Sequence, residues 1–278
     1  MINKISVIIP TCNRPKLLEI CIKKLLEAIK FSSVSVEIIV TEDGTCSSTE
    51  FIAWLNNSGV VYLKGPSKGP ASNRNNGSAH ATGDWLLFID DDCEPDLYIF
   101  SAYLKAIKNN SDCFVFEGCT QAPDKKLEAL DYAPENNNGG NLWSCNFLIR
   151  KDIFMSLRGF DENFRYAHME DIDLCDRIKA NNFKIVFCKE ALVIHPWRKL
   201  TSGVKLAKAQ EMLYYYNYKN NRHTSIIKLC KDVFFFHLAL IRRSVFNLET
   251  ARAFAMLSVH VSFLFMYHFQ WEKTYKIK

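Results

Sequence analysis

The sequence lacks the cysteine spacing of a zinc module and the glycine spacing of the common phosphate-binding loops. Its ten cysteines are scattered singly, with no C-x-x-C pair. Buried reduced thiols, as in the apolar runs around Cys113 and Cys188, are therefore the predicted state for most of them. Residues 10–15, which follow the first hydrophobic run, contain no glycine, and residues 65–69 are not followed by Lys-Ser or Lys-Thr. A Rossmann dinucleotide site and a P-loop are excluded.

A secretory leader is also missing at the start of the sequence, because residues 1–4 lead directly into the strand-length run of residues 5–9. A cytoplasmic location is therefore expected. The 278 residues are 48% hydrophobic and 23% charged, which is a globular composition and enough chain for one large domain plus an appendage. We find no internal repeat.

Charge is unevenly divided along the chain. Residues 203–278 carry 12 Lys/Arg against 4 Asp/Glu, which leaves 23 against 26 for residues 1–202. The formal net charge of +5 is therefore a property of the C-terminal part. A basic tail on a mildly acidic body indicates an anionic partner such as a lipid surface or nucleic acid.

Strand-like and helix-like segments alternate through the first part of the chain. The apolar runs predict strands over residues 5–9, 36–40, 60–63 and 85–89, and the 3.6-residue period predicts a helix over residues 15–29. A short helix through Ala79 and a polar loop over residues 123–141 complete the pattern. Alternation of this kind predicts an α/β fold with a parallel sheet flanked by helices.

Three acidic residues, Asp90, Asp91 and Asp92, directly follow the hydrophobic run of residues 85–89. Open α/β sheets bind their ligands at the carboxyl ends of the strands. The three like charges repel one another, and a cation among them offsets this repulsion. A divalent metal that also binds phosphates is such a cation. The alternative is a solvated turn after the strand.

Five motifs in a fixed order make the interpretation more specific. They are residues 5–14, residues 42–45 (Glu-Asp-Gly-Thr), residues 73–77 (Asn-Arg-Asn-Asn-Gly), residues 88–92 (Phe-Ile-Asp-Asp-Asp) and residues 170–174 (Glu-Asp-Ile-Asp-Leu), with Gly-Phe-Asp-Glu at residues 159–162 before the last. The set resembles family 2 glycosyltransferases, and the resemblance covers about residues 1–200. Cys12 and Glu42 depart from the family's common Tyr and Asp.

The resemblance implies a GT-A fold with a mostly parallel central sheet over residues 1–202, plus a basic helical C-terminal extension over residues 203–278. It also implies a metal-dependent, hexosyltransferase-like enzyme that works with inversion and uses Mn²⁺ or Mg²⁺. Such an enzyme moves a sugar from a nucleotide-diphosphate sugar to a hydroxyl of a glycan or lipid-linked acceptor, as in surface polysaccharide synthesis.

The resemblance also assigns the donor side of the site. It places Asp92 on the metal, Asp90 on the ribose or the metal, Asp43 on the base ring N–H and Arg74 near the diphosphate, where a guanidinium suits phosphate oxygens. A turn-forming role remains open for Asp43, and a surface role for Arg74. The same resemblance adds to the nucleotide-sugar site the residues Pro10, Thr11 and Asp91.

Inverting transfer needs a general base that deprotonates the acceptor hydroxyl. Asp171, with Glu170 beside it, matches that position, at the start of an apolar-periodic segment that reads as a helix. Helix capping alone is the alternative, because acids favour helix N-termini. Asp173 is a further candidate for orienting the site.

Three more residues are candidates on weaker grounds. His195 follows an apolar run, where related enzymes often complete the metal shell with a histidine, although a lone His at the end of a strand is more often structural. Trp143 and Asn146 lie where the family's acceptor-side segment runs. An aromatic ring stacks on a sugar face, but a core Trp fits the sequence equally well.

The C-terminal part contains two apolar segments without Asp, Glu, Lys or Arg, residues 233–241 and residues 253–271. The second segment is almost long enough to span a membrane, but its His, Ser and Gln residues favour a buried or interfacial helix. We therefore expect a peripheral protein at the inner face of the cell membrane, on an anionic surface, with no role for nucleic acid.

Two other functions remain open at this stage. A sugar nucleotidyltransferase also combines a nucleotide-binding sheet with a metal on carboxylates, but it usually opens with a glycine-rich loop that carries Arg and Lys, which residues 10–15 do not supply. A nucleotide-binding module without catalysis is disfavoured by the acids at the motif positions, Asp43, Asp90, Asp92 and Asp171.

Overall fold

The computed structural model describes residues 3–45, 48–125, 127–242, 244 and 247–275. The chain divides into two compact units. Unit 1 contains Met1–Ala122 and Pro134–Pro196, and unit 2 contains Pro123–Ala133 and Trp197–Lys278. A separable domain boundary at residue 202 stays a prediction.

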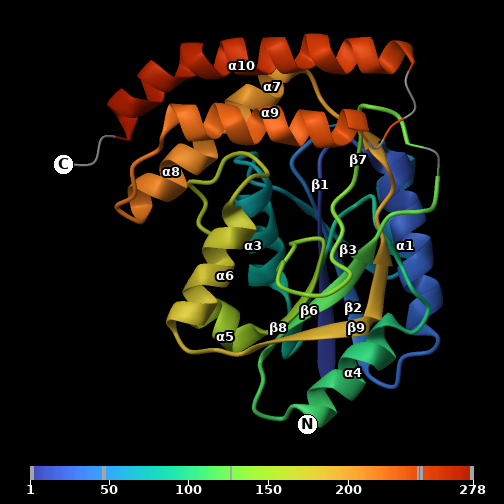
Figure 1. The fold of residues 1–278 in the computed structure, drawn as a ribbon. Helices are drawn as coiled ribbons and strands as arrows, with labels where there is room; N and C mark the ends of the chain where they lie inside the picture. The colour runs from blue at the N-terminus through green and yellow to red at the C-terminus, as the bar shows by residue number, and fades with distance from the viewer. Residues whose placement is uncertain (1–2, 46–47, 126, 243, 245–246, 276–278) are drawn as a thin grey trace. The chain divides into compact units, whose positions relative to one another are not determined.

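Unit 1 is built on an eight-stranded mixed sheet in the order β3-β2-β1-β4-β8-β6-β9-β5 (Figure 1). Its β3, β2, β1 and β4 are mutually parallel, β8 is antiparallel to both neighbours, β9 is parallel to β6, and β5 is antiparallel to β9. The strands are β1 (Lys4–Thr11), β2 (Ser35–Glu42), β3 (Val60–Lys64), β4 (Trp85–Ile89), β5 (Glu94–Pro95), β6 (Val115–Gln121), β8 (Asn146–Arg150) and β9 (Ile185–Ile194).

Helices cover both faces of this sheet because successive strand side chains point to opposite sides. One face carries Ile5, Val7 and Ile9 of β1 into a core with α1 (Pro15–Ile29), α2 (Thr49–Asn57) and α4 (Ile99–Asn109). On the other face lie α3 (Pro70–His80), α5 (Lys151–Ser156) and α6 (Glu170–Ala180) (Figure 1).

The other face is packed closely. A Cβ on Gly77 of α3 would lie 2.7 Å from the Cγ2 atom of Ile8, so α3 approaches β1 more closely than a larger residue permits. Phe88 of β4 stacks on Phe147 at 4.8 Å between ring centroids and contacts Phe154 and Phe160. These aromatic rings fix the segment before α6 against the sheet.

Strand direction decides where the polar motifs meet. Two antiparallel pairings, β4 with β8 and β8 with β6, restore the direction of β4 in β6, and β9 runs parallel to β6. The carboxyl ends of β1, β2, β4, β6 and β9 therefore lie at one edge of the sheet. Asn146 pairs with Ile89 and lies at the same edge, because β8 begins where β4 ends.

The strands and helices predicted over residues 5–89 are confirmed, most of them to within one or two residues at each end. The polar segment predicted as a loop over residues 123–141 is mostly irregular where the structure describes it, but it contains two short pieces of strand pairing. β7 (Asp131–Tyr132) pairs antiparallel with β10 (Arg198–Lys199), and Asn136 bridges to Thr120. Lys199 contacts Asp131 at 3.3 Å, so an ion pair accompanies the small β7–β10 sheet.

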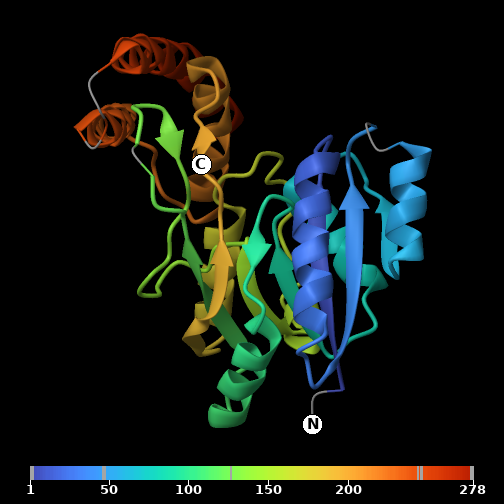
Figure 2. The ribbon, with the colours of Figure 1, turned by 90° about the vertical axis from the view of Figure 1, so that its right-hand side faces the viewer.

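Unit 2 contains four helices among the residues that the structure describes. They are α7 (Gly203–Ala209), α8 (Glu211–Lys219), α9 (Ile226–Arg242) and α10 (Leu248–Thr274). The red α10 and orange α9 run side by side in Figure 2. A Cβ on Gly203 would lie 2.7 Å from the Met256 carbonyl, so α7 also lies directly against α10.

Candidate active site

The acidic triplet after β4 is paired with arginine in this structure. Arg14 Nη1 lies 3.0 Å from Asp91 Oδ1 and 3.4 Å from Asp92 Oδ2. The hydroxyl of Thr11, at the end of β1, donates to Asp91 Oδ2 at 2.7 Å. Burial raises the pKa of Asp91 to about 6, against the opposing charge of Arg14. Two neighbouring strand ends are thereby held together by charge.

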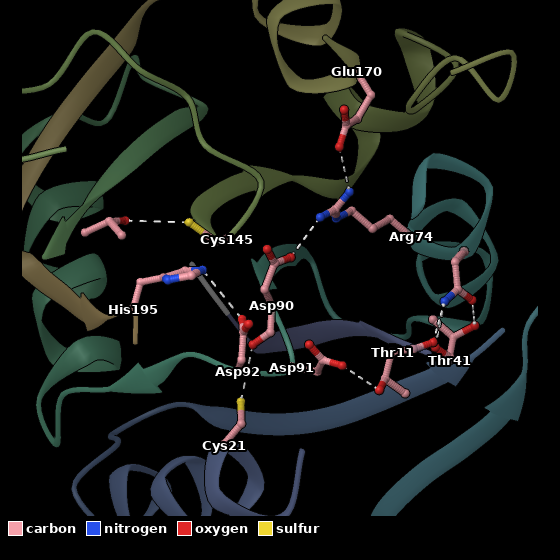
Figure 3. A network of polar contacts seen from close by, with 12 residues as sticks. Thr11, Cys21, Thr41, Arg74, Asp90, Asp91, Asp92, Cys145, Glu170 and His195 are labelled. Carbon is pink, nitrogen blue, oxygen red and sulfur yellow. Dashed lines mark hydrogen bonds and ion pairs between the residues drawn. The ribbon is translucent and has the colours of Figure 1, made fainter. Parts of the chain in front are cut away.

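Arg74 joins the triplet to the start of α6. Its Nη2 lies 2.8 Å from Asp90 Oδ1 and its Nη1 lies 3.2 Å from Glu170 Oε1 (Figure 3). The guanidinium is buried and also lies over the Phe160 ring at 5.5 Å. Three motifs that are far apart in sequence, on β4, α3 and α6, therefore meet at one side chain.

The start of α6 carries two acids in different environments. Glu170 is only 3% exposed, and burial raises its pKa to about 7, with the charge of Asp171 acting in the same direction and Arg74 opposing it. Asp171 is half-buried, and partial burial raises its pKa too. Its Oδ1 accepts from the Ile172 N–H at 2.8 Å, which is a local bond at the helix start. Asp173 points elsewhere, since its Oδ2 accepts from Arg177 Nε at 2.8 Å.

His195 closes the other side of the triplet. Its Nε2 lies 3.6 Å from Asp92 Oδ1, and both side chains are fully buried. The Nδ1 atom lies 2.9 Å from the Pro196 carbonyl, which only accepts, so this nitrogen carries the proton. In the neutral ring the Nε2 lone pair then faces a carboxylate. Such a pair fits a divalent cation, and Asp90 lies beside it (Figure 3).

The predicted base-binding residue, Asp43, holds a loop. Its Oδ1 accepts from the Ser67 N–H at 2.8 Å and its Oδ2 accepts from the Gly69 N–H at 3.1 Å. It thus fixes the segment that leads into α3, and its place at the end of β2 also keeps it at the ligand edge. Base recognition by Asp43 stays a prediction.

The predicted acceptor residues are placed in two different ways. Trp143 is half-buried and packs on the core of unit 1. Asn146 is 1% exposed, accepts from the Tyr103 hydroxyl at 2.7 Å and donates to the carbonyls of Cys119 and Ala191. Because that amide ties three strands and α4 together, we do not use Asn146 in the function proposed below. Pro10 is buried inside β1.

Three residues that the structure brings to the site had no role assigned from the sequence motifs. Arg14 lay inside the first motif, and its charge beside three acids was the signal that it would pair with them. Asn73 donates to the carbonyl of Thr41 at 2.8 Å and accepts from its hydroxyl at 2.6 Å, which fixes α3 to β2. The Cys93 sulfur lies near Asp92 and His195, and no spacing rule in the sequence indicated it.

Comparison with known protein families identifies the family of this chain. The model of Glycosyl transferase family 2 matches residues 6–158, which include every motif from β1 to the acidic triplet. The chain belongs to glycosyl transferase family 2. The fold class and the family predicted from the sequence are both confirmed.

Curated relatives of this family 2 chain come from several bacteria. A GalNAc(5)-diNAcBac-PP-undecaprenol beta-1,3-glucosyltransferase of Campylobacter jejuni is 34% identical over 161 residues, 55% of this chain and 48% of that protein. A pre-mycofactocin glycosyltransferase of Mycobacterium tuberculosis is 24% identical over 224 residues, 70% of this chain and 43% of that protein. The chain spans about half the length of these relatives, or less.

Solved structures show the same fold. The crystal structure of residues 1–349 of TarS from S. aureus matches 99% of this chain and 75% of its own, with a TM-score of 0.55 at 16% identity. A crystal structure of the same TarS residues in complex with UDP-GlcNAc matches with a TM-score of 0.55 at 16% identity. At this identity the likeness supports the GT-A architecture.

The raised pKa of Glu170 predicts a pH-dependent stability. The raised pKa means that the folded chain favours the protonated form of Glu170. The contribution of this carboxyl to the stability of the folded chain is therefore fully present below pH 4.5 and is lost as pH rises through about 7. Between pH 4.5 and 8, the unfolding free energy of Glu170→Gln should fall less than that of the unmodified chain, by up to about 3 kcal/mol. Urea unfolding at both pH values measures this, with Glu27→Gln at an exposed position of α1 as the control. The same pH dependence of unfolding free energy in Glu170→Gln and in the unmodified chain would contradict the prediction.

Proposed function

We propose that this chain is an inverting, metal-dependent glycosyltransferase. It moves a hexosyl group from a nucleotide-diphosphate sugar to a hydroxyl of a glycan or lipid-linked acceptor. The observation that carries the proposal is the Asp90–Arg74–Glu170 connection, because it joins the strand end suited to a metal and diphosphate to the helix start that carries the candidate base. The lipid-linked acceptor is supported by the undecaprenol named for the Campylobacter relative.

The donor side uses Asp90, Asp92 and His195, which would hold Mn²⁺ or Mg²⁺. A bound ion would supply positive charge beside the leaving diphosphate, where negative charge grows as the glycosidic bond breaks. Arg74, buried between Asp90 and Glu170, adds a second fixed charge on this side. Asp91 fixes Arg14 and Thr11, so its role is to position the strand ends.

The acceptor side uses Asp171 as the general base. Glu170 is almost fully buried and already paired with Arg74, so we assign it to positioning that arginine. Asp171 is more exposed at the same helix start and accepts the proton of the acceptor hydroxyl. A raised pKa makes its carboxylate a stronger proton acceptor than an exposed Asp.

The direct test is a screen of UDP-, GDP- and dTDP-sugars for binding and for hydrolysis, with Mn²⁺, with Mg²⁺ and with chelator. We expect one nucleotide class to bind in the presence of metal and to release its sugar slowly to water. Formation of a nucleotide sugar from a sugar phosphate would favour a nucleotidyltransferase. Binding without hydrolysis or transfer to any acceptor would favour an inactive nucleotide-binding module.

We also propose that unit 2 holds the chain at an anionic membrane surface. Within the described part of the chain, α10 is long and apolar enough to cross a membrane by length and composition, and 22% of its most apolar window is buried in the protein. α10 carries Phe269, which is 66% exposed, and α9 carries Phe235, which is 61% exposed, together with the exposed Lys228 and Lys231. Aromatic rings together with cations are typical of helices that lie in the headgroup region.

Membrane binding is expected to depend on these side chains. Phe235→Ser with Phe269→Ser should lower sedimentation with anionic liposomes, because two large apolar groups leave the interface. Lys228→Gln with Lys231→Gln should do the same, and added salt should weaken binding. Phe31→Ser, which removes an exposed ring from unit 1, is the matched control. Sedimentation unchanged in both double variants would contradict the proposed surface.

A further inference from the structure

Asp92, Cys93 and His195 bring three different metal-ligating atoms together. A carboxylate oxygen, a thiol sulfur and an imidazole nitrogen all lie within 4.8 Å of one another, and all three residues are buried. Asp92 and Cys93 are neighbours after β4, and His195 reaches them from the end of the parallel β9. The cluster is therefore built by strand order rather than by a local motif.

The imidazole is oriented for ligation. Its Nδ1 donates to the Pro196 carbonyl at 2.9 Å, which fixes the ring and leaves Nε2 facing Asp92 Oδ1 at 3.6 Å. A hydrogen bond from the far ring nitrogen to a carbonyl is the usual support of a metal-bound histidine. This orientation is independent of Cys93, so it is a second observation that points to a cation at the cluster.

We propose that Cys93 Sγ binds the same divalent ion as Asp92 and His195, and that the metal-free site therefore binds thiophilic transition ions more tightly than it binds Mn²⁺ or Mg²⁺. The inference rests on the proposed function, because it concerns the metal of that site. Thiolate and imidazole ligands suit Zn²⁺, Fe²⁺ and Co²⁺, whereas Mg²⁺ prefers oxygen ligands and gives up its water reluctantly. On binding, the Cys93 S–H bond breaks, the sulfur bonds to the metal, and the proton leaves to solvent.

The test uses the full chain, freed of metal with chelator and titrated with Co²⁺, whose bond to a thiolate gives a charge-transfer absorption in the near ultraviolet. We expect this absorption to rise to one Co²⁺ per chain, to disappear when Zn²⁺ is added, and to survive a large excess of Mg²⁺. Cys93→Ser should remove the absorption and weaken Co²⁺ binding by at least about 10-fold, the lower range measured when the support of a metal site is lost.

Cys188→Ser is the matched control, because Cys188 is also buried on the sheet but its sulfur contacts the Ala102 carbonyl at 3.7 Å. This variant should keep the absorption. If Cys93→Ser fails to fold, as judged by circular dichroism, the spectrum of the unmodified chain and the competition with Mg²⁺ still show whether a thiolate binds the ion. Bound Co²⁺ without the thiolate absorption overturns the proposal, and so does an absorption that persists in folded Cys93→Ser.

The failure of this inference differs from the failure of the proposed function. Sugar transfer at full rate with Mg²⁺ alone, without thiolate absorption from Co²⁺, overturns the role of Cys93 and leaves the transferase intact. Thiolate absorption without transfer or hydrolysis of any nucleotide sugar supports the metal site and removes the transferase assignment.

Discussion

Asp171→Asn is expected to lower sugar transfer by about 10²- to 10⁴-fold, the range found when a general base is lost. Asn keeps the size of the side chain and an oxygen that still accepts from the Ile172 N–H, so the start of α6 should stay folded. It does not accept the proton of the acceptor hydroxyl. Donor affinity should barely change, because Asp171 is assigned to the acceptor side. Initial rates at saturating donor, with nucleotide binding measured separately, give both quantities.

Asp176→Asn is the control, since it removes one carboxylate further along α6. Near-normal transfer by Asp171→Asn would contradict the assignment of Asp171 as the general base. Glu170, whose pKa of about 7 also suits proton transfer, would then be the candidate. Loss of donor binding together with transfer would mean that Asp171 shapes the whole pocket.

Asp92→Asn should lower metal-dependent turnover by about 10²- to 10³-fold, the cost of losing one preorganised electrostatic contact to developing charge. The variant removes the carboxylate that faces His195 at 3.6 Å, while Arg14 keeps its contact with Asp91. Donor binding that depends on Mn²⁺ should weaken in parallel. Calorimetry with and without Mn²⁺, alongside initial rates, measures both effects.

His195→Ala tests the weaker ligand in the same assays. A loss of folding without a metal-specific effect would make His195 a structural residue of the strand end. Asp96→Asn serves as the control near Asp92, because the Asp96 carboxylate accepts from the Tyr98 N–H at the start of α4. Full activity of Asp92→Asn, or of the unmodified chain in excess chelator, would defeat the metal assignment.

Two features of the site were not visible in the sequence. The acidic triplet was expected to hold a cation, and the structure also places Arg14 and Arg74 among its carboxylates. The metal assignment now depends on Asp92 facing an oriented His195 rather than on repulsion alone. Asn146 was expected to meet the acceptor, yet its amide is engaged in the core. A side chain's burial depends on neighbours that the linear order does not show.

The sequence by itself determined the elements and the family. Continuous apolar runs specified the strands of residues 4–89 and the 3.6-residue apolar period specified α1, whereas α2 was not predicted. The order of five polar motifs at strand ends and helix starts indicated family 2, which the family comparison confirms. The uneven charge likewise separated a basic tail from the body.

Only the tertiary structure decided which polar groups meet. Arg14 and Asp91 are 77 residues apart, and Arg74 and Glu170 are 96 residues apart. Two antiparallel pairings at β8 return β6 and β9 to the direction of β4, and this places His195 and Cys93 at the edge that holds Asp92. Strand order and direction are set by packing of the whole sheet, so no local pattern of residues contains them.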